Sequence, residues 1–377
     1  MRAAYLEIAL DAIRHNVRAI KQMVPPHTQI AAIAKANAYG HGAVEVCRAC
    51  VQAGAAMLCV AIADEGVELR EAGIEAPILV LGPPDPEEAE LYLTHDLIST
   101  LSDPAHATML ARAARRLGGT ARAHIKLDSG MGRHGARAGA ARELAALLPQ
   151  TPQVRVEGIF SHLADACNRD LSWSWHQLDR FRTMLAELGA CVREPLPTIH
   201  LANSAAIVRM PETHYDAVRP GAILYGLNPG FAPELMPASL RPALSLRCRI
   251  ATVKSVEAGE PVGYNCAWRA PRASRIAVLP LGYADGYPRL LSNNAEVLVG
   301  GRRCPLVGLV SMDAITIDVT DVPGARIGEE AVLIGAQGQE RITVEELAAR
   351  ADTIVEEIVA RLSRRLPRVY LGREADA

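Results

Sequence analysis

The first part of the chain alternates short apolar runs with longer stretches in which apolar residues recur at helical spacing. The runs contain few polar residues, which is typical of parallel strands buried on both faces. The stretches between them, such as 141–148 and 175–188, are rich in Ala, Leu, Glu and Arg and predict helices. Eight such units within about 200 residues favour an α/β fold, a (β/α)8 barrel of the TIM type, over a doubly wound sheet. The strands are expected at 29–34, 57–60, 77–81, 97–101, 123–127, 156–160, 197–201 and near 217–218.

The pattern changes after the proline-rich stretch 229–242. Apolar runs joined by glycine-bearing turns predict a mostly β C-terminal domain. We therefore expect a cofactor-binding barrel domain at 1–235 and a β-rich domain at 236–377, while the opening strand at 5–10 fits either. The strands of the second domain are expected at 244–253, 276–279, 295–299, 306–317 and 331–334. Two short helices should follow, each opened by a Thr-x-x-Glu capping box, Thr343 with Glu346 and Thr353 with Glu356.

Composition narrows the class of protein. The 377 residues suggest two or three domains. Because 40 Lys and Arg oppose 42 Asp and Glu, no bulk field draws the chain to nucleic acid or anionic lipid. No apolar run reaches the ~18 residues of a membrane helix, and Glu7 comes too early for a signal peptide. We expect a cytoplasmic enzyme that binds neither nucleic acid nor membrane.

A barrel carries its chemistry on the loops after the C-terminal ends of its strands. Unusual polar or small residues follow, or close, five of the predicted strands, so we expect them to face one mouth of the barrel. They are Lys35 at the first strand, Lys126 and Arg133 at the fifth, His162 at the sixth, Asn203 and Ser204 at the seventh, and Arg219, Gly221 and Ala222 at the eighth.

These residues suggest a cofactor. Asn203 and Ser204 open a helix, and Gly221 offers bare backbone after the eighth strand, where barrels commonly hold a phosphate group. Lys35 closes a buried strand, so poor solvation should favour the neutral amine that imine formation requires. A lysine across the mouth from a phosphate site suggests pyridoxal 5′-phosphate held as a Schiff base. We expect no metal site.

Residues 130–135 also spell GxGxxG, the fingerprint of dinucleotide binding. That fingerprint should open the first βαβ unit, whereas here it follows the fifth strand and carries Arg133 inside the turn. We favour a turn without a dinucleotide.

With these residues in place, nearly the whole chain resembles alanine racemase, a fold-type III family that depends on pyridoxal phosphate. The resemblance is specific because several separate motifs carry it. They are AKANAYGHG at 34–42, KLDSGMGR at 126–133, NSA at 203–205, RPG at 219–221, VGY at 262–264, GYADG at 282–286 and SMD at 311–313.

The resemblance implies a two-base racemisation of an amino acid, most simply of L-alanine and D-alanine. Lys35 would hold the cofactor and act on one face of the α-carbon. Tyr264 would act on the other face and would come from the partner subunit, so the active sites of a homodimer would be shared. The D-alanine product would feed peptidoglycan.

The family also implies roles for the remaining residues. Tyr39, Asn203, Ser204, Gly221 and Ala222 would hold the cofactor and its phosphate. Arg219 would face the pyridine nitrogen, with a cationic His162 between it and the Tyr264 hydroxyl. Arg133 would approach the substrate carboxylate, oriented by Lys126, which is often carbamylated in relatives. Tyr283, Met312 and Asp313 would border the substrate's path from the second chain.

One position departs from the family. Relatives usually carry an aromatic residue, commonly tyrosine, beside the cofactor phosphate where this chain has Glu356. We favour the view that Glu356 merely completes the Thr353 capping box. The alternatives are a reshaped pocket with a different or broader amino-acid range, or weaker cofactor affinity. A fold-type III decarboxylase and a non-catalytic pyridoxal phosphate carrier are competing functions, although Tyr264 argues against the first and the second domain against the other.

Overall fold

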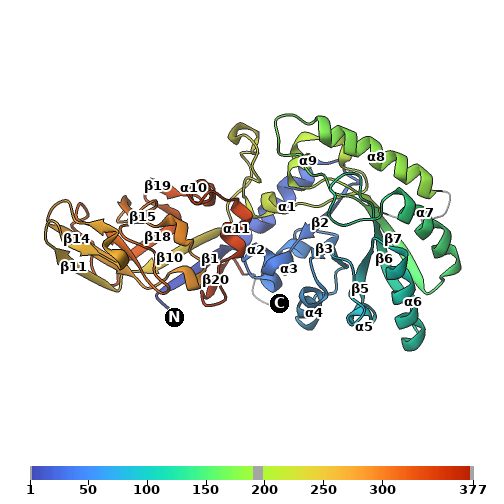
Figure 1. Cartoon of the computed structure of the whole chain (residues 1–377), viewed down its shortest axis with the longest axis horizontal. Helices are drawn as coiled ribbons and strands as arrows, with labels where there is room; N and C mark the ends of the chain where they lie inside the picture. Colours follow the sequence, from blue (N-terminus) through green and yellow to red (C-terminus); the bar gives the residue numbers. More distant parts are fainter. Residues whose placement is uncertain (1, 190–197, 374–377) are drawn as a thin grey trace. The chain divides into compact units, whose positions relative to one another are not determined.

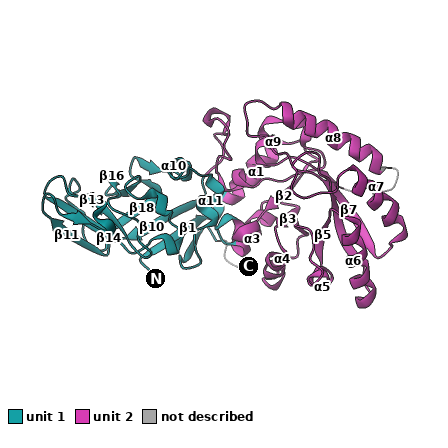
Figure 2. Cartoon of the chain, viewed as in Figure 1, with its two compact units in different colours: residues 1–12, 39–42, 242–377 teal, residues 13–38, 43–241 magenta. Residues whose placement is uncertain are grey.

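The computed structural model describes residues 2–189 and 198–373 (Figure 1). By its internal contacts the chain divides into two compact units (Figure 2). The barrel unit comprises residues 13–38 and 43–241, and the β-rich unit comprises residues 1–12, 39–42 and 242–377. The boundary predicted at 235/236 stays a prediction.

Eight parallel strands of the barrel unit close into a barrel, which confirms the predicted fold. Seven of the predicted runs and the short one near 217 all contain a strand, although Pro197, expected in the seventh, lies outside the described residues. The strands are β2 (Gln29–Ile33), β3 (Met57–Val60), β4 (Ile78–Val80), β5 (Leu97–Leu101), β6 (Ala121–Lys126), β7 (Val154–Phe160), β8 (Thr198–His200) and β9 (Ala217–Val218).

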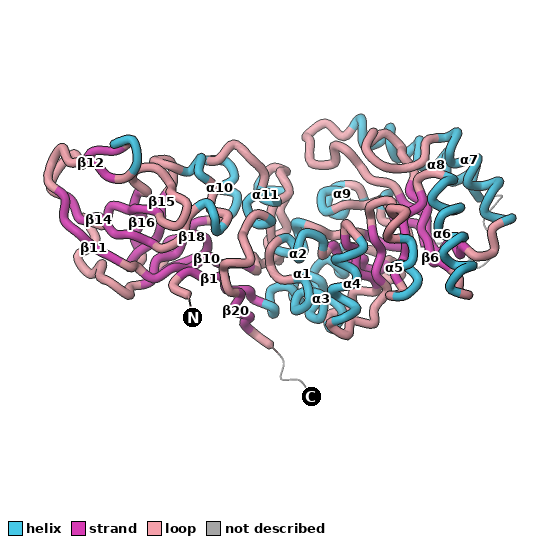
Figure 3. Tube along the Cα trace, turned by 60° about the horizontal axis from the view of Figure 1, so that its bottom comes forward, coloured by secondary structure: helices cyan, strands magenta, loops and turns pink. Residues whose placement is uncertain are grey.

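Helices alternate with these strands and lie outside them (Figure 3). All five residues of β5 are buried, as expected for a strand covered on both faces. Local signals set the helix ends: at Pro104–Leu117, Asp103 caps the first turn by accepting from the Ala105 amide, and Gly118 ends the helix in the left-handed region. The helices are α1 (Leu10–Met23), α2 (Lys35–Tyr39), α3 (Ala43–Gln52), α4 (Ala63–Glu71), α5 (Ala89–Thr94), α6 (Pro104–Leu117), α7 (Ala138–Leu147), α8 (Ser172–Gly189) and α9 (Ser204–Arg209).

The β-rich unit is built mainly from antiparallel strands. Its largest sheet has the order β16-β15-β18-β10-β1-β20, with β19 paired to β18. A second sheet has the order β11-β14-β17, and β12 pairs with β13. The strands are β1 (Ala4–Ala9), β10 (Leu244–Arg249), β11 (Thr252–Val256), β12 (Pro261–Val262), β13 (Trp268–Arg269), β14 (Ser274–Leu279), β15 (Glu296–Val299), β16 (Arg302–Pro305), β17 (Ile315–Asp318), β18 (Glu330–Gln337), β19 (Glu340–Ile342) and β20 (Arg368–Leu371).

The opening strand belongs to this unit, since β1 pairs antiparallel with β10 and parallel with β20. Its alternating burial fits a sheet with one covered face. No helix in the two described ranges is long and apolar enough to cross a membrane.

Two predicted strands of this unit are wrong in extent. The run 244–253 is divided because the Ile250 amide bonds to the Glu329 carbonyl just before β18, whereas the Ala251 amide bonds to Val278 of β14, which belongs to the other sheet. The run 306–317 turns back on itself, since Ser311 donates to the Ala314 carbonyl and Val307 to that of Thr316. Only 315–318 form a strand there, and Leu306, Val307 and Val310 before it are buried within a loop.

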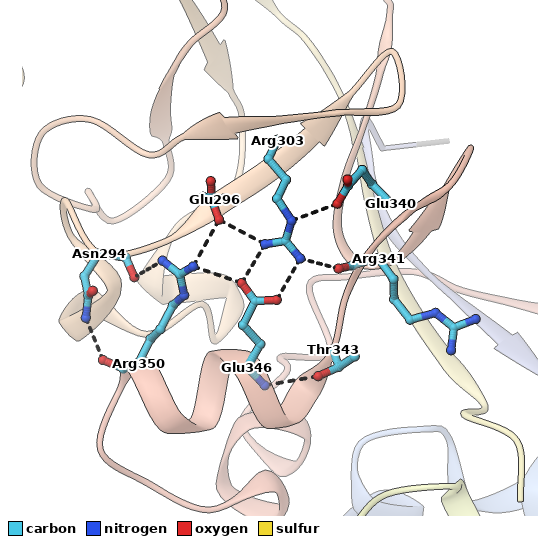
Figure 4. Close-up of polar contacts among 8 residues, drawn as sticks. All are labelled: Asn294, Glu296, Arg303, Glu340, Arg341, Thr343, Glu346 and Arg350. Atoms are coloured by element: carbon cyan, nitrogen blue, oxygen red, sulfur yellow. Dashed lines mark hydrogen bonds and ion pairs between the residues drawn. The ribbon is translucent and has the colours of Figure 1, made fainter. Parts of the chain in front are cut away.

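Helices α10 (Val344–Arg350) and α11 (Val355–Ala360) complete the unit. Half of the first predicted capping box is present: the Thr343 hydroxyl accepts from the Glu346 amide at 3.1 Å, whereas the Glu346 carboxylate pairs with Arg303 and Arg350. An ion-pair network centred on Arg303 joins α10 to the sheet (Figure 4). Its contacts are Arg303 with Glu296 (2.9 Å), Glu340 (3.0 Å) and Glu346 (2.8 Å), and Arg350 with Glu296 (3.0 Å) and Glu346 (3.1 Å).

Candidate active site

Lys35 lies just after the end of β2, directly before the backbone enters the left-handed region. The next four residues, Ala36–Tyr39, have φ between 52° and 54°, which is a left-handed turn. Such a turn costs roughly 1–2 kcal/mol for each L-residue, so local contacts must hold it. Glu65 supplies one, because its carboxylate accepts from the Ala36 amide at 2.5 Å and from the Ala61 amide at 2.7 Å.

Asn37 supplies a second contact to this turn, since its Oδ1 accepts from the Ala43 amide at 2.8 Å. The left-handed turn was not expected from the sequence. The available signal was the run of Asn37, Gly40 and Gly42 directly after a buried strand, because these residue types tolerate positive φ.

Arg219 is a buried cation of the barrel unit, and it is 3% exposed. Its Nη1 donates to the His200 carbonyl at 3.0 Å, and its Nη2 donates to the carbonyls of Ser161 (2.6 Å) and Leu201 (3.1 Å). Burial lowers the pKa of Arg219 to about 10, so the side chain remains a cation at neutral pH. Its orientation is therefore fixed by the ends of strands β7 and β8.

Arg219 also determines the proton positions of two histidines. Nη1 lies 2.8 Å from His200 Nδ1 and Nη2 lies 3.3 Å from His162 Nδ1. A guanidinium can only donate, so both Nδ1 atoms accept and both rings carry their proton on Nε2. Burial, followed by the charge of Arg219, holds the pKa of each histidine well below its usual range. The expectation of a cationic His162 is therefore wrong: the ring is neutral, with an Nε2–H to donate.

Three residues of this cluster were missed from the sequence. His200 stacks on Phe160 at 4.9 Å between ring centroids, and His124 lies against His200. Histidines within otherwise apolar strands were the available signal, since a buried imidazole needs a polar partner.

Lys126 lies on β6 beside the same cluster. Its Nζ is 5.4 Å from the centre of the Phe160 ring. Burial is the main cause that lowers the Lys126 pKa to about 8, and the nearby charges of Arg219, Arg133 and Lys35 lower it further. The Lys126 amine thus lies within electrostatic range of Lys35, Arg133 and Arg219.

The loops after β8 and β9 are joined to each other. Ser204 Oγ accepts from the Gly221 amide at 2.9 Å. Asn203 caps α9 by accepting from the Ala206 amide at 3.1 Å. Ala222 is buried next to Gly221. The structure thus brings together four of the five residues predicted to hold the cofactor and its phosphate, and the Ser204 hydroxyl keeps its own proton to donate.

The GxGxxG segment is a closed turn. Asp128 Oδ1 accepts from the amides of Gly130 and Gly132, each at 3.0 Å, and Arg137 Nε contacts Asp128 Oδ2 at 3.3 Å. Amides that would have to face a pyrophosphate are therefore used internally, which supports the interpretation as a turn. Arg133 is exposed at the tip of this loop.

The remaining predicted residues belong to the β-rich unit. Tyr264 is 69% exposed, Met312 is 53% exposed and Tyr283 is 42% exposed. Backbone bonds place Tyr283 against the 311–312 turn, because its amide donates to the Ser311 carbonyl at 3.1 Å. Asp313 accepts from Arg365 at 2.6 Å. Two aromatic rings and a methionine are thus displayed on the surface of this unit.

Comparisons with known proteins agree with this architecture. The family model for the N-terminal domain of alanine racemase matches residues 8–229, and the model for the C-terminal domain matches 243–370. The alanine racemase of Symbiobacterium thermophilum is 47% identical over 376 residues, covering 100% of this chain and 99% of that protein.

Two solved structures show the same likeness. The alanine racemase of Streptomyces lavendulae is 39% identical with a TM-score of 0.92, covering 99% of this chain and 98% of that one. The enzyme of Bartonella henselae, solved with covalently bound pyridoxal phosphate, is 30% identical with a TM-score of 0.88, covering 98% of this chain and 100% of that one.

Proposed function

The chain belongs to the alanine racemase family, whose members are isomerases, and on that premise we propose that it interconverts L-alanine and D-alanine with pyridoxal 5′-phosphate as cofactor. The observation that carries the proposal is the convergence of Lys35 and Arg219 at the barrel mouth that also holds the Ser204–Gly221 contact. The family membership supports a role in supplying D-alanine for peptidoglycan in the cytoplasm.

The donor set at this mouth fits the cofactor. Lys35 offers a primary amine for the aldehyde, and Ser204 offers a hydroxyl to the phosphate beside backbone of Gly221 and Ala222. Asn203 supports this loop as the cap of α9, and we assign Tyr39 to the phosphate as well, as the family resemblance implies. When bound, the cofactor supplies a conjugated ring that stabilises negative charge on the substrate α-carbon.

Arg219 would face the pyridine nitrogen of the cofactor. A guanidinium keeps its proton because its pKa remains far above neutrality even after burial. Arg219 would therefore donate a hydrogen bond to that nitrogen and offer it no proton to take up. We propose that this moderates the electron withdrawal by the ring and so favours return of the proton to the α-carbon over side reactions.

The two bases would be Lys35 and the partner subunit's Tyr264. Lys35 Nζ would take or return the proton on one face of the α-carbon, and the phenol oxygen would do so on the other. A tyrosine has an ordinary pKa near 10, so its phenolate needs stabilisation. The neutral His162 can donate its Nε2–H to that oxygen, while the charge of Arg219 acts from behind the ring.

A homodimer accounts for the exposed residues of the β-rich unit. Tyr264, Tyr283 and Met312 are large side chains that this unit leaves exposed. We propose that a second copy covers them, so that residues 236–377 of one chain contribute to the site of the other. Tyr283, Met312 and Asp313 would then border the path of the substrate.

Arg133 would bind the substrate carboxylate. Because the Lys126 pKa is lowered to about 8, a substantial fraction of its amine is neutral near physiological pH. A neutral amine can attack CO2, forming a C–N bond and losing a proton to give a carbamate. The resulting negative charge would lie among the cations of this mouth and orient Arg133.

A lysine exchange tests the proposal. Lys35→Ala should abolish both the visible absorbance of the covalently held cofactor and racemisation, whereas Lys254→Ala, which changes an exposed lysine of β11, should retain both. Wild-type protein should lose the absorbance on borohydride treatment with permanent attachment of the cofactor to a peptide that contains Lys35. Racemisation by Lys35→Ala would contradict the assignment.

Substrate range is tested separately. Incubation with several L-amino acids, followed by chiral analysis and a measurement of released CO2, should yield D-alanine from L-alanine without CO2. Release of CO2 would indicate a decarboxylase instead, and absence of any turnover by the cofactor-loaded protein would indicate a carrier.

A further inference from the structure

Residues 39–42 are packed directly on α11 within the β-rich unit. A Cβ added at Gly40 would lie 2.1 Å from the carbonyl oxygen of Val359, so only glycine permits this approach. Arg368 fixes the segment, because its Nη2 and Nε donate to the Gly40 carbonyl at 3.0 Å and 3.2 Å. The backbone next to Tyr39 is therefore held against the face of α11 that carries Val359.

Glu356 lies on that same face. It precedes Val359 by three residues, and residues three apart in a helix are neighbours on one side. Tyr39 directly precedes Gly40, so its backbone lies at the start of the segment that packs on α11. The electrostatics agree: burial, followed by the negative charge of Glu356, raises the pKa of Tyr39 above its usual range. Tyr39 therefore stays a hydroxyl donor beside a carboxylate.

The capping explanation of Glu356 is wrong. The Thr353 hydroxyl donates to Glu357 rather than serving a box with Glu356. The helix begins at Val355, with Ile354 as its N-cap and no side-chain bond at that cap. Glu357 is exposed and pairs with Arg361 at 2.6 Å. The two adjacent carboxylates thus differ in surroundings: Glu357 is exposed to solvent, whereas the charge of Glu356 raises the pKa of Tyr39.

We propose that Glu356 sets how tightly this chain holds its cofactor, by competing with the phosphate for the Tyr39 hydroxyl. This inference rests on the proposed function, in which Tyr39 donates to the phosphate. A phosphate dianion and a carboxylate that share one donor repel each other. The cofactor is then retained mainly by Lys35 and by the loop of Ser204 and Gly221, and it exchanges more readily than it would with a neutral side chain at position 356.

The test measures cofactor retention rather than turnover. Holoenzyme is dialysed to equilibrium against graded concentrations of pyridoxal 5′-phosphate, and the bound fraction is taken from its visible absorbance. Glu356→Gln should lower the dissociation constant on the order of tenfold, as expected for removing a like charge at the edge of an anion site. Glu356→Asp, which retains the charge, and Glu357→Gln, the matched neighbour, should leave it unchanged.

A parallel series with pyridoxal, which lacks the phosphate, locates the effect. Glu356→Gln should not change the dissociation constant for pyridoxal. Glu356→Tyr, which removes the charge and adds a hydroxyl, is the second variant should the glutamine protein not fold, and it should also bind pyridoxal 5′-phosphate more tightly. Equal or weaker binding in the folded variants overturns the role of Glu356, whereas absence of the absorbance in every protein, wild type included, overturns the proposed function and this inference together.

Discussion

His124 and His200 are joined inside the barrel by a 2.9 Å contact between Nδ1 of His124 and Nε2 of His200. Because Arg219 donates to His200 Nδ1, the bridging proton belongs to His200, and His124 accepts it. The neighbouring strand makes room for this pair, since a Cβ at Gly158 would lie 2.5 Å from the His124 ring. A fixed donor chain therefore runs from Arg219 through His200 to His124.

The first prediction is that His124 helps to position Arg219. His124→Leu leaves the His200 Nε2–H without its acceptor in a buried site, which should cost about 1–3 kcal/mol of unfolding free energy. It should also lower the racemisation rate, because the orientation of His200 and hence of Arg219 is loosened. His124→Asn, whose side-chain oxygen can accept the same bond, should recover much of both. Urea unfolding and steady-state rates measure these effects, and equal behaviour of the two variants would argue that only ring volume matters.

The second prediction concerns acid. Burial, the largest cause, lowers the pKa of His124 to about 4, and that of His200 also lies well below its usual range. Below the ordinary histidine pKa of about 6.5, these histidines bind a proton in the unfolded chain but remain neutral in the folded chain. The free energy of unfolding therefore falls as the pH falls from about 6.5 toward 4. The slope is at most about 1.4 kcal/mol per pH unit for each histidine. His124→Asn should make this fall less steep, as measured by urea midpoints at several pH values, and an unchanged slope would refute the assignment of a neutral His124.

The third prediction concerns the left-handed turn after Lys35. Glu65→Ala removes the carboxylate that accepts from the Ala36 and Ala61 amides, so the turn loses part of its support and Lys35 loses its fixed position. We expect a lower fraction of covalently attached cofactor and a slower reaction. Glu68→Ala on the same helix is the control, since Glu68 bonds to neither amide. Full attachment in Glu65→Ala would show that the turn holds without its carboxylate.

The sequence predicts the barrel well because each of its buried parallel strands is marked by a continuous apolar run. Such a run can be recognised in the sequence without knowing which strands pair with it. The sequence predicts Lys35, Ser204 and Gly221 for a similar reason, since they directly follow such runs. The prediction fails where the surroundings of a residue depend on contacts with residues that are distant in the sequence. The apolar neighbours of His124 indicate a buried histidine, but they do not identify His200 as its partner. Thr353-x-x-Glu356 matches a capping box although the helix begins one residue later. The run 306–317 fails because apolar residues within a packed loop look like a strand.

The fourth prediction concerns Lys126. With its pKa lowered to about 8, the amine becomes increasingly neutral as the pH rises through that value, so a carbamate should form more completely at pH 8 than at pH 6. Protein equilibrated with 13C-bicarbonate should show a carbamate carbon signal that Lys126→Gln lacks. Lys254→Gln should keep the signal, since that lysine is exposed. A signal that persists in Lys126→Gln would assign the carbamate to another amine.

The last prediction separates the two proposed bases. Tyr264→Phe removes only a hydroxyl from an exposed ring, so the fold and the visible absorbance of the cofactor should be unchanged. The rate should fall by on the order of 10²–10⁴, the usual contribution of one acid–base group. Tyr5→Phe is the matched control, because the Tyr5 hydroxyl contacts Glu330 at 3.2 Å and has no part in the proposed site.

The equilibrium constant requires equal losses in both directions, so the assignment of faces needs isotope exchange. The enantiomer served by Tyr264 should lose exchange of its α-proton with solvent, and the enantiomer served by Lys35 should retain it. If both enantiomers kept exchange at the wild-type rate, Tyr264 would not be a base. Mixing Tyr264→Phe with Lys35→Ala protein should restore part of the activity, because a mixed dimer with shared sites would contain one site with both bases intact, whereas sites built from single chains would gain nothing.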